Sequence, residues 1–355
     1  MNESKKSRPK PRPLYARPGA RFTCFSDGLC CTDIHALGPL TRAEVKDLKV
    51  FANDCVEFNE DAEDMCLATT NNGGACYFQR NGLCGIHADH GPEAKPTGCR
   101  RFPYGLVSTP DGGRVTTEHR CSCRTLGVRP PVDLKEAEVS LADRSGRLEV
   151  DQAVPSRMPI STRKRITWQN YRELENELLQ RLADGEPAEA VLDAEPLPPL
   201  ESSEWPVYAA EFFGMVDGTA GGTALGYFGD ALLHVSAGHF PPERDRPWAE
   251  AFERARLRTP EPQDPEQMFN DWVADELWML RFLEWGALDR GRAELATRLL
   301  VARTIATRIE QMGVRPDQAV AEALMCVDIA TASSEWPKAV EDIDLPKEPK
   351  AKQAS

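Results

Sequence analysis

The distribution of cysteine constrains this chain more than any other feature of its sequence. Eleven cysteines occur in 355 residues, and ten of them lie between Cys24 and Cys123. Eight of these ten fall into three segments: Cys24–Cys31, Gly74–Pro103 and Cys121–Cys123. No apolar run follows the charged N-terminal residues, which favours a cytoplasmic protein with reduced thiols. Reduced thiols at this density indicate metal ligation or redox chemistry rather than a disulfide framework.

Eight cysteines are candidate metal ligands because they lie in these three segments. They are Cys24, Cys30, Cys31, Cys76, Cys84, Cys99, Cys121 and Cys123. Thiolates hold Zn²⁺ tetrahedrally and also hold iron–sulfur clusters. Eight thiols suffice for two four-ligand sites, or for one cluster and a redox pair. Metal-binding energy becomes folding energy in such a region, which suits its many turns and few long apolar runs.

The other cysteines and the histidines are interpreted as structural residues. Three histidines of the region could ligate as neutral imidazoles: His87, His90 and His119. We expect surface or hydrogen-bonded roles for them, because the thiols already fill the coordination. Cys55 and Cys66 lie in an acidic segment and are predicted to be ordinary residues. Cys326 lies among apolar residues at helical spacing, which predicts a core thiol.

Two local signals place secondary structure inside the cysteine region. Thr41 with Glu44 forms a capping box, which predicts a helix over 41–52, followed by a loop over 53–73. Asn81-Gly82 predicts a β-hairpin over Cys76–His87. A two-residue loop would set Cys76 and Cys84 on opposite faces, whereas a three-residue loop would put them on one face. The sequence does not decide between these registers.

The chain is predicted to be an α+β protein with a cysteine-rich metal-binding domain of short hairpins and a mainly α-helical second part. The expected divisions are a disordered basic arm over 1–20, the metal-binding domain over 21–130 and a connector over 131–162. A helical domain over 163–336 and a disordered tail over 337–355 follow. Within these, 138–150 is read as a hairpin. The stretch 217–229 is read as a flexible glycine-rich loop.

Overall charge limits the partners that the sequence supports. The formal net charge is −13, which argues against nucleic-acid binding. The first 22 residues carry seven Lys or Arg and one acid, which suits a solubilising tail or a tether to an acidic partner. The most apolar late stretch, 224–240, is broken by Asp230, His234 and several glycines. It is too polar to span a membrane, so no membrane association is expected.

The cysteine region resembles the zinc- or iron-chelating CxxCxxCC family, which includes bacterial flagellin lysine N-methylases. The order and spacing of the family's motifs match over about eighty residues. The matching motifs are Phe22-Thr-Cys24, Cys30-Cys31, Leu40-Thr41 with Glu44, Cys76-Tyr-Phe78, Gly82-Leu-Cys84-Gly-Ile86 and Cys99-Arg100-Arg-Phe102-Pro103. One departure is clear, because Asp27 stands where the family has its second cysteine. Asp27 could ligate through oxygen, or Cys121 and Cys123 could complete the site.

The resemblance implies an iron–sulfur cluster or zinc as cofactor. It also implies, as an alternative, S-adenosylmethionine-dependent N-methylation of lysine in a protein substrate. No strand–GxGxxG–helix pattern is present to bind the methyl donor, so the sequence alone leaves catalysis undecided. A thiol redox protein using Cys121-Ser-Cys123 is a second alternative, without a thioredoxin-like βαβ context. Arg100 and Arg101 could tune a cluster's charge or bind an anion, or form a plain surface pair.

Overall fold

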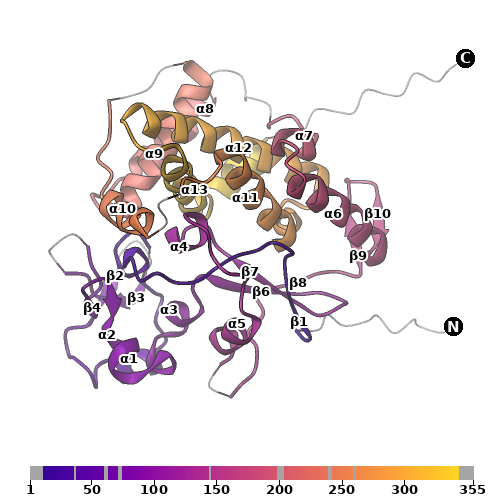
Figure 1. Cartoon of the computed structure of the whole chain (residues 1–355). Coiled ribbons are helices and arrows are strands. Elements are labelled where there is room, and N and C mark those ends of the chain that lie inside the picture. Colours follow the sequence, from indigo (N-terminus) through magenta and orange to yellow (C-terminus); the bar gives the residue numbers. More distant parts are fainter. Residues whose placement is uncertain are drawn as a thin grey trace, which may run out of the picture.

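The structure is a computed structural model that describes most of the chain. The described residues are 11–35, 37–59, 63–70, 74–143, 145–197, 204–238, 242–258 and 261–343. Small sheets and short helices form the first part of the chain, and helices dominate after residue 167 (Figure 1). The predicted mixed α/β composition with a helical C-terminal part is therefore confirmed. Within the described residues, no helix combines the length and the apolar character that a membrane crossing needs.

A four-stranded sheet lies at the centre of the first part. Its strands run in the order β1 (Leu14–Ala16), β7 (Gly113–Thr117), β6 (Tyr104–Ser108) and β8 (Gln152–Ala153). β6 and β7 form an antiparallel hairpin, β1 is parallel to β7 and β8 is parallel to β6. Helix α5 (Leu134–Leu141) covers one face and α11 (Pro265–Met279) lies over the other (Figure 1). The sheet thereby joins the two halves of the molecule.

The predicted disordered arm over 1–20 is wrong for the part that the structure describes. Leu14–Ala16 pair with Gly113–Val115 as β1, and the Arg17 side chain beyond them is only 7% exposed. Arg17 forms ion pairs with Asp271 and Asp275 of α11. These distant partners override the basic, proline-rich composition from which disorder was predicted. Residues 1–10 lie outside the described part.

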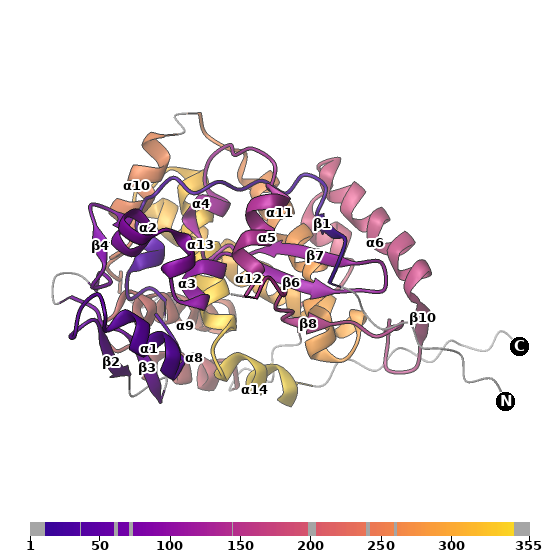
Figure 2. The ribbon, with the colours of Figure 1, turned by 90° about the horizontal axis from the view of Figure 1, so that it is seen from below.

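The cysteine region is made of short elements linked by turns. They are the 3₁₀ helices η1 (Leu29–Cys31) and η2 (Pro92–Ala94), the helices α1 (Arg42–Leu48), α2 (Gly85–His90), α3 (Thr97–Arg101) and α4 (Ser122–Thr125), and the strands β2 (Val56–Asn59), β3 (Asp64–Leu67), β4 (Gln79–Arg80) and β5 (Leu83–Cys84). The capping box of Thr41 and Glu44 is present at the start of α1. The predicted loop over 53–73 is wrong in part, because β2 and β3 form a hairpin there. Seen from below, α3 lies next to α5 (Figure 2).

The hairpin predicted over 138–150 is also wrong in part. Residues 134–141 form α5, whose Asp133 N-cap accepts a hydrogen bond from the Lys135 N–H. A reversal does follow, because Ala142 pairs with Leu148 as an isolated bridge. The alternation that suggested a strand arises because one side of α5 packs on the sheet: Ala137 and Leu141 are buried while Val139 is 55% exposed.

The helical half contains one large hydrophobic core. The hairpin of β9 (Arg157–Pro159) and β10 (Arg165–Thr167) leads into α6 (Trp168–Ala183), α7 (Ala188–Leu192), α8 (Glu204–Gly214), α9 (Ala220–Ala237), α10 (Ala249–Leu257), α11, the 3₁₀ helix η3 (Arg281–Trp285), α12 (Leu288–Gln311), α13 (Pro316–Thr331) and α14 (Glu335–Asp342). Side chains of Thr167 and Asp264 cap α6 and α11. Cys326 is completely buried on α13, which confirms its interpretation as a core thiol.

Two further predictions for this half are wrong. The glycine-rich stretch 217–229 is not a loop, because from Ala220 onward it belongs to α9. The glycines allow close packing: a Cβ on Gly229 would lie 3.1 Å from the Ala209 carbonyl oxygen of α8. The tail beyond Trp336 continues as α14, which is anchored by completely buried Trp336 and Val340. Residues 344–355 lie outside the described part.

Candidate functional site

Seven of the eight predicted cysteines line one cavity. The cavity has a volume of about 550 Å³, and its thiols are those of Cys24, Cys30, Cys31, Cys76, Cys84, Cys99 and Cys121. Apolar side chains such as Phe78, Ile86 and Phe102 form much of the remaining wall. The eighth thiol, Cys123, lies behind this wall, where its Sγ is 3.1 Å from Asp27 Oδ2. All eleven cysteines are free.

Backbone hydrogen bonds bring the cysteine segments together. The Cys76 N–H donates to the Cys31 carbonyl at 2.8 Å, and Thr32 pairs with Ala75 as an isolated bridge. The Gln79 side-chain amide donates to the Gly28 carbonyl at 2.9 Å and to the Cys31 carbonyl at 3.2 Å. Loop Cys24–Cys31 is therefore fixed to the β4–β5 hairpin at several points.

The predicted hairpin is confirmed with a two-residue loop at Asn81-Gly82. Its pairing ends at Gln79 with Cys84, because Gly85 begins α2. The expectation that this register would set Cys76 and Cys84 on opposite faces is wrong. The chain turns into α2 at Cys84, so the strict alternation of a longer strand does not apply, and both thiols line the cavity.

Close approach of two glycines lets the hairpin tip pack on the cysteine loop. Gly28 has a φ of +83°, and a Cβ there would lie 2.8 Å from Gly82 Cα. Gly28→Ala is therefore expected to combine left-handed strain with a backbone clash. Gly146→Ala is a matched control, since Gly146 has a φ of +77° with no atom within 4 Å of an added Cβ. The control should lose about 1–2 kcal/mol of unfolding free energy. Gly28→Ala should lose more and should also bind less metal.

The outcome is measured by denaturant unfolding together with metal content for both variants. Equal destabilisation of the two variants, with unchanged metal content, would show that the Gly28–Gly82 contact does not hold the thiol segments together.

The thiols form two adjoining groups. The first contains Cys30, Cys31 and Cys84, with Cys76 and Cys99 nearby; Cys30 Sγ and Cys31 Sγ are 3.9 Å apart. The second contains Cys24, Cys121 and Cys123. Backbone N–H groups point at the second group, since Phe25 N lies 3.2 Å from Cys123 Sγ and Ser26 N lies 3.3 Å from Cys24 Sγ. Such N–H···S contacts are the kind that stabilise thiolates around metals.

The electrostatic environment separates Cys84 from the other thiols. The hydrogen bond with Cys31 lowers the pKa of Cys84 to about 5, and the backbone near His87 and the charge of Lys95 act in the same direction against burial. Burial raises the pKa of Cys76 to about 11 and the pKa of Cys99 to about 12. A lowered pKa favours the thiolate of Cys84, the form that binds metal.

Asp27 and Arg129 form the inner wall behind the second group. Asp27 Oδ1 accepts a hydrogen bond from the Leu29 N–H at 3.0 Å, and Asp27 is 5% exposed. Arg129 is 2% exposed, donates to the Cys123 carbonyl at 2.9 Å and stacks over the Phe25 ring at 3.3 Å. A buried guanidinium here compensates negative charge on Asp27 and on nearby thiolates. The sequence identified the Asp27 position but gave no signal for Arg129.

The histidines of the cysteine region do not join the thiols in one ligand set. His87 lies at the exposed rim of the cavity, and His90 stacks on Phe51 with ring centroids 4.3 Å apart. His119 is buried and does not line the cavity, and its Nε2 lies 3.0 Å from Asp275 Oδ2. Cys55 and Cys66 are buried beside the site without lining the cavity, and the Cys55 thiol lies 3.0 Å from the Ala52 carbonyl oxygen.

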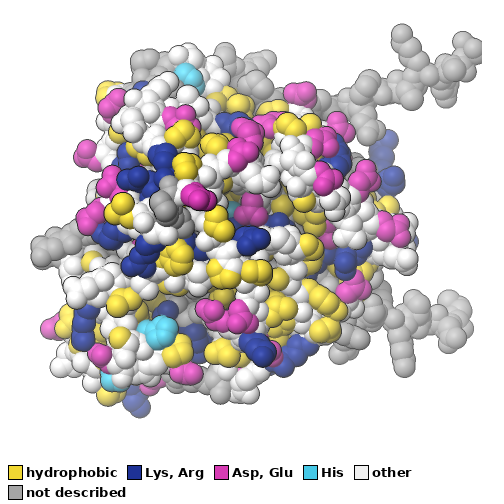
Figure 3. Space-filling model, viewed as in Figure 1, with side chains coloured by type: hydrophobic (Ala, Val, Ile, Leu, Met, Phe, Trp, Pro, Cys, Tyr) yellow, Lys and Arg dark blue, Asp and Glu magenta, His cyan; other side chains and the backbone are white. Residues whose placement is uncertain are grey.

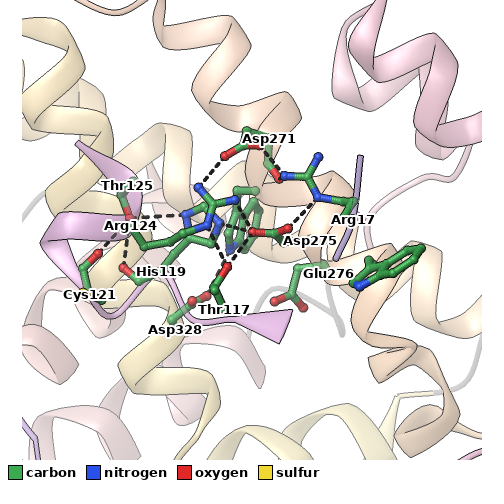
Figure 4. A network of polar contacts seen from close by, with 12 residues as sticks. Arg17, Thr117, His119, Cys121, Arg124, Thr125, Asp271, Asp275, Glu276 and Asp328 are labelled. Carbon is green, nitrogen blue, oxygen red and sulfur yellow. Dashed lines mark hydrogen bonds and ion pairs between the residues drawn. The ribbon is translucent and has the colours of Figure 1, made fainter. Parts of the chain in front are cut away.

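A buried polar network links the end of the sheet to α11 (Figure 4). Arg17 Nε lies 2.5 Å from Asp275 Oδ1, and Arg124 Nη1 lies 2.6 Å from Asp271 Oδ2. Arg124 also pairs with Asp275, and Arg17 with Asp271. Burial would raise the pKa of Asp275, but the charges of Arg124 and Arg17 outweigh it and hold that pKa well below its usual range. The sequence showed no sign of this network.

Two chemical interpretations of this network fail on its surroundings. Within the described residues, His119, Asp271 and Asp275 form the one group of three or more potential ligands whose atoms all lie within 4.8 Å of one another, so no three thiols approach one another this closely. Both carboxylates, however, are already paired with guanidinium groups, which would repel a metal ion. Thr125, His119 and Asp275 also follow the hydroxyl–imidazole–carboxylate order of a catalytic triad, with Thr125 Oγ1 3.2 Å from His119 Nδ1. All three are buried, so the network is structural.

Comparison with known protein families, with characterised proteins and with solved structures finds no match in any of the three.

Acidic and basic side chains are spread over the face shown in Figure 3. The thiol-lined cavity is the feature on which a functional interpretation can rest.

Proposed function

We propose that this chain is a metal-chelating protein whose thiol cavity holds zinc or an iron–sulfur cluster. The observation that supports the proposal is the convergence of seven cysteines, from segments up to a hundred residues apart, on one cavity. Thiols that served only as packing residues would not be expected to line the same cavity. Soft thiolate donors, with few carboxylates among them, suit zinc or iron–sulfur clusters better than hard cations.

The residues proposed to hold the metal are the eight predicted cysteines. Cys30, Cys31, Cys76, Cys84 and Cys99 would form one group, and Cys24, Cys121 and Cys123 would complete or extend it. Asp27 is hydrogen bonded to Leu29 and lies against Cys123, so we assign it to the surroundings of the thiols rather than to the ligand set. A metal in this cavity would tie together loops that otherwise share only a small hydrophobic core.

The proposal includes membership of the CxxCxxCC type, which its motif order supports. Lysine methylation with S-adenosylmethionine is supported by the resemblance alone. The glycine-rich stretch 218–226 lies at the start of α9, and its close contacts there are to Asp33, Asp217 and Arg244. A redox role for Cys121-Ser-Cys123 has little physical support, because Cys121 and Cys123 are only 8% and 2% exposed.

Metal content of the full chain tests the proposal. The protein is purified without oxygen and analysed for metals, labile sulfide and visible absorption on one sample. We expect stoichiometric zinc, or iron with sulfide and a brown colour. Cys326→Ala is the matched control: it removes a thiol buried on α13 outside the cavity and should leave metal content unchanged. Metal-free protein with eleven titratable thiols, or loss of metal from the Cys326 variant, would contradict the proposal.

A further inference from the structure

A second cavity shares a wall with the thiol cavity. It has a volume of about 370 Å³ and lies between α3, the segment 37–40 and the start of β6. Cys30, Cys99, Phe102 and Tyr104 line both cavities. A molecule in the second cavity would therefore lie directly beside thiols of the proposed metal centre. Volumes of this size are typical of small-molecule sites.

Charged groups of both signs, in equal number, surround the second cavity. Arg101 Nη2 lies 2.6 Å from Asp151 Oδ2, and Arg120 forms an ion pair with Glu118. His35 lines the same cavity, and burial, with the charge of Arg120 acting in the same direction, lowers its pKa to about 3. The imidazole is therefore neutral at pH 7 and offers hydrogen bonds without charge. The two arginines and the two carboxylates of the lining thus neutralise each other in pairs.

Three side chains of this lining have buried polar atoms that lack a hydrogen-bond partner. They are Arg101 at Nε, Tyr104 at Oη and His35 at both ring nitrogens. A buried donor without a partner is costly, and a bound molecule or water would remove that cost. The guanidinium of Arg101 is already held in position by Asp151 and by Glu149 at 3.5 Å. A hydrogen-bond acceptor on a bound molecule would therefore find the Arg101 guanidinium already in position.

We propose that the second cavity binds a small zwitterion of the amino-acid class, with its carboxylate toward Arg101 and its amino group toward Glu118. The four charged groups of the lining already neutralise one another as ion pairs, so a simple anion or a simple cation would leave a net charge there, whereas a zwitterion adds none. Its carboxylate can accept a hydrogen bond from Arg101 Nε, which has no partner. Apolar residues Leu37, Leu40 and Phe102 would contact its side chain. This inference concerns a second cavity and does not depend on which metal the thiols bind.

Gly98 supplies a substitution that fills the cavity without disturbing the fold. It lines the second cavity, and no atom lies within 4 Å of a Cβ added there. Gly98→Met should therefore project into open space. Gly214→Met is the matched control, because Gly214 is also an exposed helical glycine with no atom within 4 Å of an added Cβ, and it lines neither cavity.

Isothermal titration of the purified full chain tests the proposal. Each of the twenty standard L-amino acids is titrated singly, and the tightest binder is compared with its N-acetyl form and its amide. We expect the free amino acid to bind at least about tenfold more tightly than either blocked form, because hydrogen bonds to charged groups are the strong ones. Gly98→Met should abolish binding, and Gly214→Met should not change it.

Each other outcome would overturn the proposal. If none of the twenty amino acids binds, the proposal of an amino-acid site in the second cavity is wrong. Equal binding of a blocked form would show that one of the two charges is not recognised. Unchanged binding by Gly98→Met would place the ligand elsewhere. Metal content is measured on the same samples, so failure here is distinguishable from failure of the proposed metal centre.

Discussion

Replacement of Cys84 by serine is expected to remove most of the bound metal. Cys84 lines the thiol cavity and has a lowered pKa, which favours binding as thiolate. Serine keeps the shape of the side chain but supplies only a hard hydroxyl oxygen. Changes to groups outside the ligand set typically cost 10–100-fold in metal affinity, so losing a ligand should cost at least about 100-fold. Metal per chain, measured after dialysis against a weak chelator, gives the result.

The same variant should melt at a lower temperature because metal-binding energy contributes to folding. Cys55→Ser is the matched control. Cys55 is completely buried in the same hydrophobic cluster and does not line the cavity, and a serine there can still donate to the Ala52 carbonyl. The control should retain metal. Full metal content in Cys84→Ser, or equal loss in both variants, would refute the assignment of Cys84 as a ligand.

Signals that act within a few residues were reliable guides to this fold. The capping box at Thr41 starts a helix where predicted. Asn81-Gly82 forms the predicted two-residue loop. Each of these depends on hydrogen bonds between neighbours in the chain, so the local sequence contains the whole interaction.

The wrong predictions share a dependence on distant partners. β1 exists because β7, about a hundred residues later, offers an edge, and Arg17 is buried because α11 supplies two carboxylates. α14 is held by Trp336, whose Nε1 donates to Glu294 of α12 at 2.7 Å. Composition predicted disorder at both ends of the chain, because composition contains no information on what lies opposite.

The candidate site was predictable in its members and not in its surroundings. Thiol density and motif order identified eight cysteines, and seven of them line one cavity. Arg129, Tyr104 and His35 carry no sequence signal that distinguishes them from ordinary residues. Their positions follow from the sheet and from packing against Phe25, Phe22 and Phe102 respectively. Only the fold could show that they surround the thiols.

Replacement of Asp275 by asparagine is expected to give the largest loss of stability outside the metal centre. Asp275 compensates two buried guanidinium groups, those of Arg17 and Arg124, whose side chains are 7% and 2% exposed. Asparagine keeps the shape but leaves these charges with Asp271 alone. Removing one partner from a buried ion pair typically costs about 3–5 kcal/mol. Glu250→Gln is the control, since its pair with Arg254 involves a carboxylate side chain that is 83% exposed and should cost less than about 1 kcal/mol.

The same network predicts how stability depends on pH. Arg124 and Arg17 hold the pKa of Asp275 below its usual range against the effect of burial, and the pKa of Asp271 is lowered in the same way. A depressed folded-state pKa gives stability that is present above the unfolded pKa of about 3.9 and is lost as pH falls below it. Denaturant unfolding from pH 7 to pH 3 should therefore show a steeper acid loss in the wild type than in Asp275→Asn. Parallel pH profiles would mean that Asp275 does not carry this charge in the folded protein, and the network would then have to be held by Asp271 alone.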